Sequence, residues 1–275
     1  MDSMPQFFRF PSSDILVRRL GLATRGNTSL HKDDVLLALD RGVNYWNWCG
    51  HEDGMSEAIR ELGTRRTQVV IGIQLTARED REARHELEKI LERLKTDYID
   101  VVSLYYVETS EDWAQVMGPK GAFSSLKKAN EEGLLKMIGL TTHQRPLAKR
   151  ILSSRHLDLL MVRYNAAHRG AEKELFPLAQ QLGVPLVSFT GLRWKALLSS
   201  TPEDPKDFTP PLAREWYRFV LANPAVSVAL MAPNGRMELL ENLELLSDWR
   251  LPEPQEYETL RRHGDRVRRH AGSFP

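Results

Sequence analysis

Side chains that bind or transfer protons are concentrated at the ends of short apolar runs in this sequence. His51 and Glu52 follow one such run, Tyr105 ends another, His143 follows a third, and Arg163 lies at the end of a fourth. A histidine beside an acidic residue can act as a general base near neutral pH, and a tyrosine opposite it can donate a proton. Arg163 can bind a carboxylate or phosphate through paired hydrogen bonds. If these ends meet, the sequence predicts a small-molecule site in which His143 and Arg163 contact the ligand.

The apolar runs have the length of strands and alternate with longer amphipathic segments. The candidate strands are Val17–Leu22, Val43–Trp48, Val69–Gln74, Tyr98–Tyr105, Lys136–Thr141, Leu157–Tyr164, Pro185–Phe189 and Val226–Leu230. This alternation predicts parallel strands that close into a (β/α)8 barrel, with the site at their carboxyl ends. An open doubly wound sheet is the alternative, which the absence of G-x-G-x-x-G after the first strand disfavours. We expect one domain over residues 1–275, because barrels of about 250 residues are routinely single domains.

Periodicity and composition assign the remaining segments. The runs with helical spacing of apolar residues include His85–Leu94, Phe123–Leu135 and Glu172–Leu182. The Pro-rich segment Leu192–Pro211 predicts a loop over the strand ends, and Pro252–His270 predicts a final charged helix. We expect residues 1–14 to lie across the bottom of the barrel or to stay loose.

Composition excludes several classes of function. A formal net charge of +1 gives no global field that would attract nucleic acid or an anionic membrane. The single cysteine, Cys49, excludes an intrachain disulfide and a multi-cysteine metal site. The chain has no run of about 18 apolar residues and no signal-peptide pattern at its start. His51, Glu52 and Asp53 are adjacent in one loop, and zinc needs ligands in a defined geometry that adjacent residues rarely supply. We therefore expect a cytoplasmic protein without a metal, nucleic-acid or membrane partner.

Local motifs occur in an order and spacing that resemble one known family. The matching segments are residues 20–24 (LGLAT), 38–47 (ALDRGVNYWN), 94–100 (LKTDYID), 133–141 (GLLKMIGLT), 163–165 (RYN), 223–226 (NPAV) and 239–242 (LLEN). Their shared order is similar to that of the aldo-keto reductases. The resemblance implies a (β/α)8 barrel and a family chemistry in which a nicotinamide cofactor reduces carbonyls.

The residues that the resemblance assigns to catalysis are replaced in this chain. The family uses a tyrosine as proton donor, a lysine and an aspartate that lower its pKa, and a histidine that orients the carbonyl. The aspartate position holds Asn47, the lysine position Gln74 and the histidine position Tyr105, while the tyrosine position falls on His51 or Glu52. Amides at the first two positions could hydrogen-bond to each other without burying a net charge.

The positions that the resemblance assigns to cofactor binding are mixed. Thr141 keeps a hydroxyl where the family holds the nicotinamide amide, and Phe189 keeps a ring that could stack on nicotinamide. Arg236, with Asn242 after it, falls where the family binds adenosine, and an arginine there could meet a 2′-phosphate. The resemblance thus implies NADP or NAD as a cofactor, although the neighbouring amides of the family pattern are replaced by Thr142 and Met161.

These observations lead to one main hypothesis and two alternatives. We expect an aldo-keto reductase-like barrel that does not reduce carbonyls through the family's four residues and instead carries a non-catalytic or altered small-molecule site at the barrel mouth. One alternative is an NAD(P)H-dependent oxidoreductase whose proton comes from His51, Glu52 or Tyr105. The other is a lyase or isomerase that needs no redox cofactor and uses His51 and Tyr105 as its acid–base pair.

Overall fold

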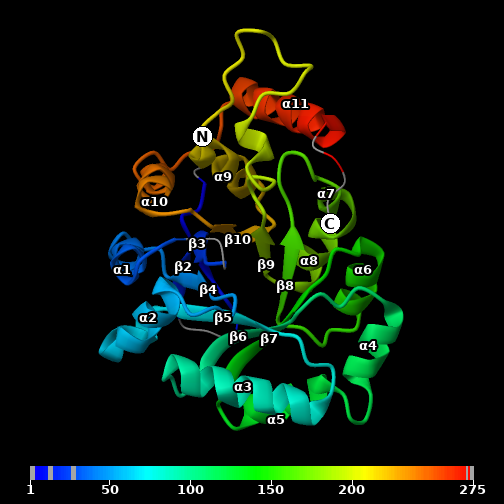
Figure 1. Ribbon diagram of the computed structural model, residues 1–275. Coiled ribbons are helices and arrows are strands. Elements are labelled where there is room, and N and C mark those ends of the chain that lie inside the picture. Colours follow the sequence, from blue (N-terminus) through cyan, green and yellow to red (C-terminus); the bar gives the residue numbers. More distant parts are fainter. Residues whose placement is uncertain (1–3, 12–14, 26–28, 271, 273–275) are drawn as a thin grey trace.

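The chain folds into a closed barrel of parallel strands surrounded by helices (Figure 1). The computed structural model describes residues 4–11, 15–25, 29–270 and 272. The barrel strands, in order, are β3 (Leu20–Ala23), β4 (Tyr45–Asn47), β5 (Val70–Leu75), β6 (Ile99–Leu104), β7 (Leu135–Thr141), β8 (Leu159–Arg163), β9 (Leu186–Phe189) and β10 (Val226–Met231), and β10 pairs with β3 to close the ring. The predicted (β/α)8 barrel is confirmed, and the open doubly wound sheet is wrong.

Helices cover the outside of the barrel. They are α1 (Lys32–Asp40), α2 (Gly54–Glu61), α3 (Asp80–Leu94), α4 (Ser110–Met117), α5 (Ala122–Glu131), α6 (Arg145–Ser153), α7 (Ala171–Glu174), α8 (Phe176–Leu182), α9 (Ala213–Ala222), α10 (Arg236–Leu243) and α11 (Pro254–His270), with 3-10 turns η1 (Gly63–Gln68), η2 (Ala196–Leu198) and η3 (Glu244–Leu246). The helix predicted over Glu172–Leu182 is interrupted at Leu175. Pro177 explains the break, because its nitrogen cannot donate to the carbonyl four residues earlier.

The first predicted strand, Val17–Leu22, is wrong as a single element. Strand β2 (Leu16–Arg18) pairs antiparallel with β1 (Phe7–Arg9), and the barrel strand begins only at Leu20. Arg19 lies between the two strands and changes pairing partner: its backbone nitrogen donates to the carbonyl of Gln6 at 2.9 Å, and its own carbonyl accepts from the backbone nitrogen of Ala229 at 2.7 Å. Its buried guanidinium donates to the carbonyl oxygens of Val226 at 2.7 Å and Leu221 at 3.1 Å.

The start of the chain closes the amino-terminal end of the barrel, as expected for the part of residues 1–14 that is described. Phe10 is fully buried, and its ring centroid lies 5.7 Å from that of Tyr45, the first residue of β4. Residues 1–3 and 12–14 lie outside the described residues.

Alternation along β4 divides its side chains between two cores. Trp46 and Trp48 belong to the core between strands and helices, whereas Tyr45 belongs to the cluster that fills the barrel. Asn47 therefore shares the inner face with Tyr45, since successive side chains of a strand point to opposite sides. Both tryptophans therefore face the surrounding helices.

The long connection from β9 to α9 follows the predicted loop over Leu192–Pro211, with η2 as its helical turn. It is bound to α11, which begins at Pro254 within the predicted Pro252–His270 segment and lies beside the loop in Figure 1. Asp204 makes this connection, because its carboxylate contacts Nδ1 of His263 at 3.1 Å and Nε of Arg266 at 2.6 Å. Among the described residues, no helix has the length and apolar character needed to cross a membrane.

Candidate functional site

A hydrogen-bonded pair of amides lies inside the carboxyl end of the barrel. Asn47 ends β4, and Gln74 lies one residue before the end of the neighbouring β5. Nε2 of Gln74 donates to Oδ1 of Asn47 at 2.7 Å, and Nδ2 of Asn47 lies 3.4 Å from Sγ of Cys49. Asn47 is only 3% exposed, and both polar atoms of its side-chain amide have uncharged hydrogen-bond partners. The expected amide–amide hydrogen bond is confirmed.

The loop after β4 carries the two residues that compete for the tyrosine position. The carboxylate of Glu52 forms ion pairs with Arg60 on α2 and with Nε of Arg93 on α3, the latter at 3.1 Å. The hydrogen bond from Arg60, assisted by Arg93, holds the pKa of Glu52 below its usual range. Glu52 is thus engaged by the outer helices and is a poor proton donor. His51 is exposed, and its backbone carbonyl accepts from Nε1 of Trp48 at 2.7 Å.

An aromatic row crosses the mouth of the barrel. The rings of Tyr105 and Tyr106 stack with centroids 4.0 Å apart, Tyr106 lies 4.4 Å from His143, and His143 lies 6.0 Å from Phe189. The structure therefore brings together three residues that were predicted separately, from the ends of β6, β7 and β9. Tyr106 was not assigned to the site, although the Tyr–Tyr pair at a strand end was its visible signal. Burial is the main cause that raises the pKa of Tyr106, and a hydrogen bond with Tyr105 raises it further, so this phenol stays protonated.

His143 is held by an acid that sequence reasoning missed. Glu108 accepts a hydrogen bond from the backbone nitrogen of His143 at 2.9 Å and approaches its Nδ1 at 3.3 Å. Burial lowers the pKa of His143, Glu108 opposes this, and the nearby Arg163 lowers it further. Glu108 lies in the turn before α4, so only the folding of β6 against β7 brings it to His143.

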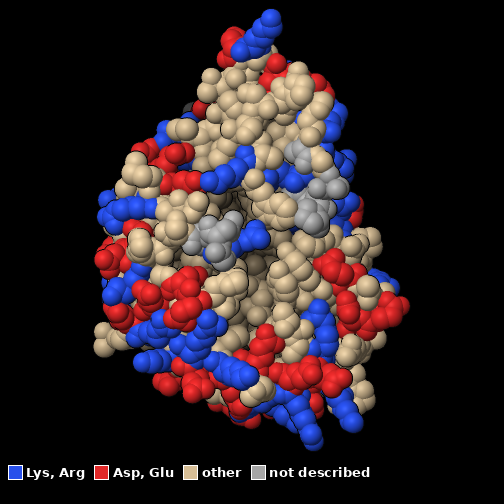
Figure 2. Space-filling view, in the orientation of Figure 1, with Lys and Arg blue, Asp and Glu red and all other residues tan. Residues whose placement is uncertain are grey.

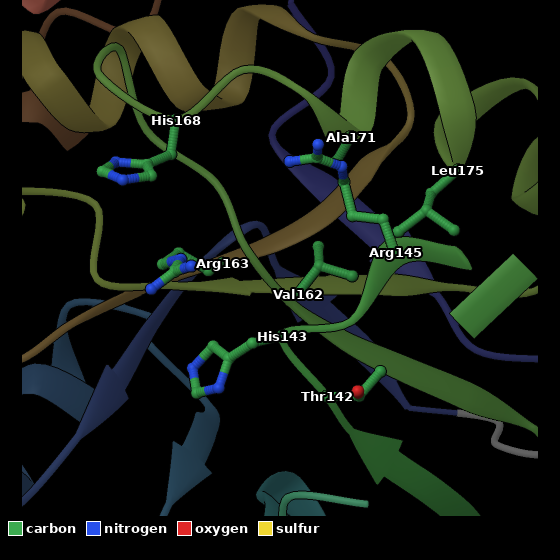
Figure 3. A pocket seen from close by; sticks show the side chains of 8 residues that line it. All are labelled: Thr142, His143, Arg145, Val162, Arg163, His168, Ala171 and Leu175. Carbon is green, nitrogen blue, oxygen red and sulfur yellow. The ribbon is translucent and has the colours of Figure 1, made fainter. Parts of the chain in front are cut away.

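A pocket lies beside the aromatic row, at the ends of β7 and β8. Figure 3 shows the side chain of Arg163 between those of His143 and His168, at the left of the view. Arg145 and Thr142 lie at the right of the view. His168 was not predicted as a site residue. Burial is the main reason why the pKa of His168 falls to about 4, and Arg163, Arg193, Arg268 and Arg145 lower it further.

The lowered pKa of His168 predicts pH-dependent stability. The unfolded chain binds a proton at this histidine near pH 6.5, whereas the folded chain does so only near pH 4, so stability is complete above about pH 6.5 and falls as the pH drops towards 4. Allowing for partial exposure, we expect a loss of about 1–2 kcal/mol over this interval.

Urea unfolding at several pH values measures this loss. The variant His168→Gln should show a flatter profile between pH 6.5 and 4, while His85→Gln, a change on the exposed face of α3, should keep the wild-type slope. Equal slopes in the wild type and His168→Gln would contradict the assignment.

The predicted cofactor residues are distributed around the same end of the barrel. Oγ1 of Thr141 donates to the carbonyl of Leu104 at 3.3 Å. Arg236 begins α10 and forms an ion pair with the buried Asp34 at 2.8 Å. Asn242 is buried, and its Oδ1 has no hydrogen-bond partner among the described residues. The described part of the chain holds no group of three His, Cys, Asp or Glu side chains suited to a metal ion.

Comparisons with known proteins give a consistent result. Residues 20–216 match the model of the aldo/keto reductase family. A soybean (Glycine max) protein named "Probable aldo-keto reductase 1" is 22% identical over 200 residues, which are 64% of this chain and 56% of that protein. The NADH-specific methylglyoxal reductase of Escherichia coli K12 is 26% identical over 131 residues, 48% of this chain and 38% of that protein. The matched segments thus span about half the length, or less, of these relatives.

One solved structure shows the similarity of fold. The aldo/keto reductase from Klebsiella pneumoniae, described in complex with NADP and acetate, superposes with a TM-score of 0.77 over 94% of this chain and 95% of that chain. Its identity to this chain is 18%, so the similarity concerns the fold.

Proposed function

Because the chain belongs to the aldo/keto reductase family, we propose that it is a member that binds a small molecule at the barrel mouth without reducing a carbonyl by the family's proton transfer. The hydrogen bond of 2.7 Å between Gln74 and Asn47 carries this proposal. These amides occupy the places where the resemblance requires a lysine and an aspartate, and neither amide carries a charge at neutral pH.

The physical consequence concerns proton donation. A phenol releases its proton readily near neutral pH only when a cation lowers its pKa from the reference of about 10. The amide pair supplies no cation, and Glu52 is already bound by Arg60 and Arg93. Since general acid catalysis contributes about 10²–10⁴-fold to a rate, its loss removes most of the expected activity.

A second candidate, an NADP- or NAD-dependent oxidoreductase, is favoured by separate observations. Phe189 offers a partly buried ring, and Asn242 offers a buried amide oxygen without a partner in the described chain. The relative from Klebsiella pneumoniae is described with NADP, and the one from Escherichia coli is named as NADH-specific. Against it, Arg236 is already paired with Asp34, so a 2′-phosphate would have to replace an existing ion pair.

The two candidates are separated by one assay in two steps. Tryptophan fluorescence is titrated with NADPH and with NADH, and methylglyoxal, the substrate named for a relative, is then supplied with each cofactor. We expect no methylglyoxal-dependent oxidation of either cofactor above the rate without protein. Turnover that is lost in Tyr105→Phe or His51→Ala would contradict the proposal and support the oxidoreductase instead. Turnover that is unchanged in both variants would contradict the proposal and also remove these residues as donors.

A further inference from the structure

The pocket at the ends of β7 and β8 has a basic lining. Its walls are formed by Thr142, His143, Arg145, Val162, Arg163, His168, Ala171 and Leu175. This lining contains two arginines and two histidines but no carboxylate. The side chains come from the end of β8, the segment from β7 into α6, and the segment from β8 into α8, and Figure 3 shows them around one space.

Positive charge gathers at this pocket from several parts of the fold. Arg163 ends β8 and Arg145 begins α6, while Arg193 follows β9 and Arg268 lies on α11. All four lie close enough to His168 to disfavour its protonation, although burial contributes more. Grouped cations repel one another, so this arrangement is less favourable when the pocket holds only water than when it holds an anion. In Figure 2, basic side chains likewise reach the edge of the central hollow.

The carboxylates near the pocket are bound at its edge. Oε1 of Glu108 contacts the backbone nitrogen and Nδ1 of His143, and Oε2 of Glu174 lies 3.1 Å from Nε of Arg145. Neither acid is among the residues that form the walls. These pairs position His143 and Arg145 from outside the pocket, and the polar part of the wall consists of Thr142 and the basic side chains.

The start of α6 adds to the positive electrostatic potential at the pocket. The helix begins at Arg145 with no acidic residue in its first turn, and the side chain of Gln144 makes no capping hydrogen bond. The amino-terminal end of a helix carries a partial positive charge. The residues that lead into this end, Thr142 and His143, form part of the pocket wall.

We propose that this pocket binds the carboxylate or phosphate group of a small anionic ligand, with Arg163, Arg145 and His168 as its contacts. The inference rests on the proposed function, because it names the ligand class for the small-molecule site at the barrel mouth. A cavity of about 30 Å³ accommodates roughly two water molecules, which suits a charged head group but not a whole metabolite. His143 belongs both to the pocket wall and to the aromatic row of Tyr105, Tyr106, His143 and Phe189. The remainder of the ligand would therefore extend from the pocket along this row.

Binding of simple anions tests the proposal. Inorganic phosphate and acetate are each titrated by calorimetry at constant ionic strength, with chloride as the balancing anion. We expect one binding site for at least one of them and at least tenfold weaker binding in Arg163→Gln. The matched control is Arg150→Gln, which removes the same charge from an exposed position on α6 and should change affinity less than twofold. Preference for phosphate or for acetate identifies the head group.

An NMR titration of His168 provides a readout that does not depend on the stability of a variant. In the wild-type protein, a bound anion should raise the pKa of His168 from about 4 by at least one unit, because it stabilises the imidazolium. The imidazole of His85, which is exposed on α3, serves as the internal control. The proposal is overturned if neither anion binds at about 10 mM, tenfold above a Kd of 1 mM, or if Arg163→Gln binds as tightly as the wild type.

The outcome of the anion titrations can be told apart from the outcome of the cofactor assay. Methylglyoxal turnover together with anion binding at Arg163 would overturn the proposed loss of reductase chemistry and keep the anion pocket. Absence of both would keep the proposed loss of reductase chemistry and overturn the pocket.

Discussion

Replacing Asn47 by aspartate should destabilise the protein by on the order of 3 kcal/mol, and adding Gln74→Lys should recover part of that loss. Asn47 is 3% exposed, so a carboxylate there would be buried beside the neutral Gln74 amide. A lysine at position 74 would supply the missing cation at the same place. We expect a coupling free energy of about 2 kcal/mol between the two substitutions. Urea unfolding of the wild type, both single variants and the double variant measures it.

The control for this cycle pairs Asn47→Asp with Gln68→Lys. Gln68 is exposed in η1, so this second double variant has the same net charge without a cation at position 74. It should be as unstable as Asn47→Asp alone, within about 0.5 kcal/mol. Additive effects of Asn47→Asp and Gln74→Lys would show that the two side chains are not neighbours, and the assignment of positions 47 and 74 to the family's ion pair would fail.

Replacing Asp204 by alanine should cost about 3–5 kcal/mol of folding free energy. Its carboxylate is only 1% exposed and contacts the backbone nitrogen and hydroxyl of Thr201, Nδ1 of His263 and Nε of Arg266. Burial raises the pKa of Asp204, but the hydrogen bonds outweigh this effect and lower the pKa to about 2. Truncation would leave His263, itself fully buried, without its partner and would release the long loop from α11.

The neighbouring acid provides the comparison for Asp204→Ala. Glu203 pairs with Arg269 and His270, but its side chain is 42% exposed, so Glu203→Ala should destabilise the protein much less than Asp204→Ala. Chemical unfolding at pH 7 compares the two variants, and hydrogen exchange of α11 reports whether the loss is local. Equal stability of the two variants would contradict the role of Asp204 as the connection between loop and helix.

The barrel itself could be predicted from local pattern. Parallel strands buried on both faces read as short apolar runs, and the amphipathic segments between them must lie outside, so the alternation predicts parallel strands with helical crossovers. The number of strands, eight, and the absence of G-x-G-x-x-G then favour the closed barrel over an open sheet. Errors arose where one long-range contact overrides local preference. At Arg19 the backbone changes its partner from Gln6 in the hairpin to Ala229 in the barrel, while carbonyl groups of α9 and β10 bind its guanidinium. The residue types between Val17 and Leu22 give no sign of this change.

The amide pair could also be inferred before the structure, because motif spacing fixes Asn47 and Gln74 at the ends of adjacent strands. The roles of Glu52 and His168 could not. Glu52 looks like a candidate acid in sequence, yet its partners Arg60 and Arg93 come from two separate helices. His168 lies in a connecting segment, and its importance follows only from the arginines that surround it.

The sequence by itself determined the order of strands, the inner face of β4 and the neutral character of the residues at positions 47 and 74. These properties depend on periodicity and spacing within short segments. Only the tertiary structure decided which charges meet: that Glu108 holds His143, that Glu52 is engaged by the outer helices, and that Arg145, Arg163 and His168 share one pocket. The reason is physical, because closing the barrel brings together strand ends that are tens of residues apart, and electrostatic interactions depend on distance in space rather than along the chain.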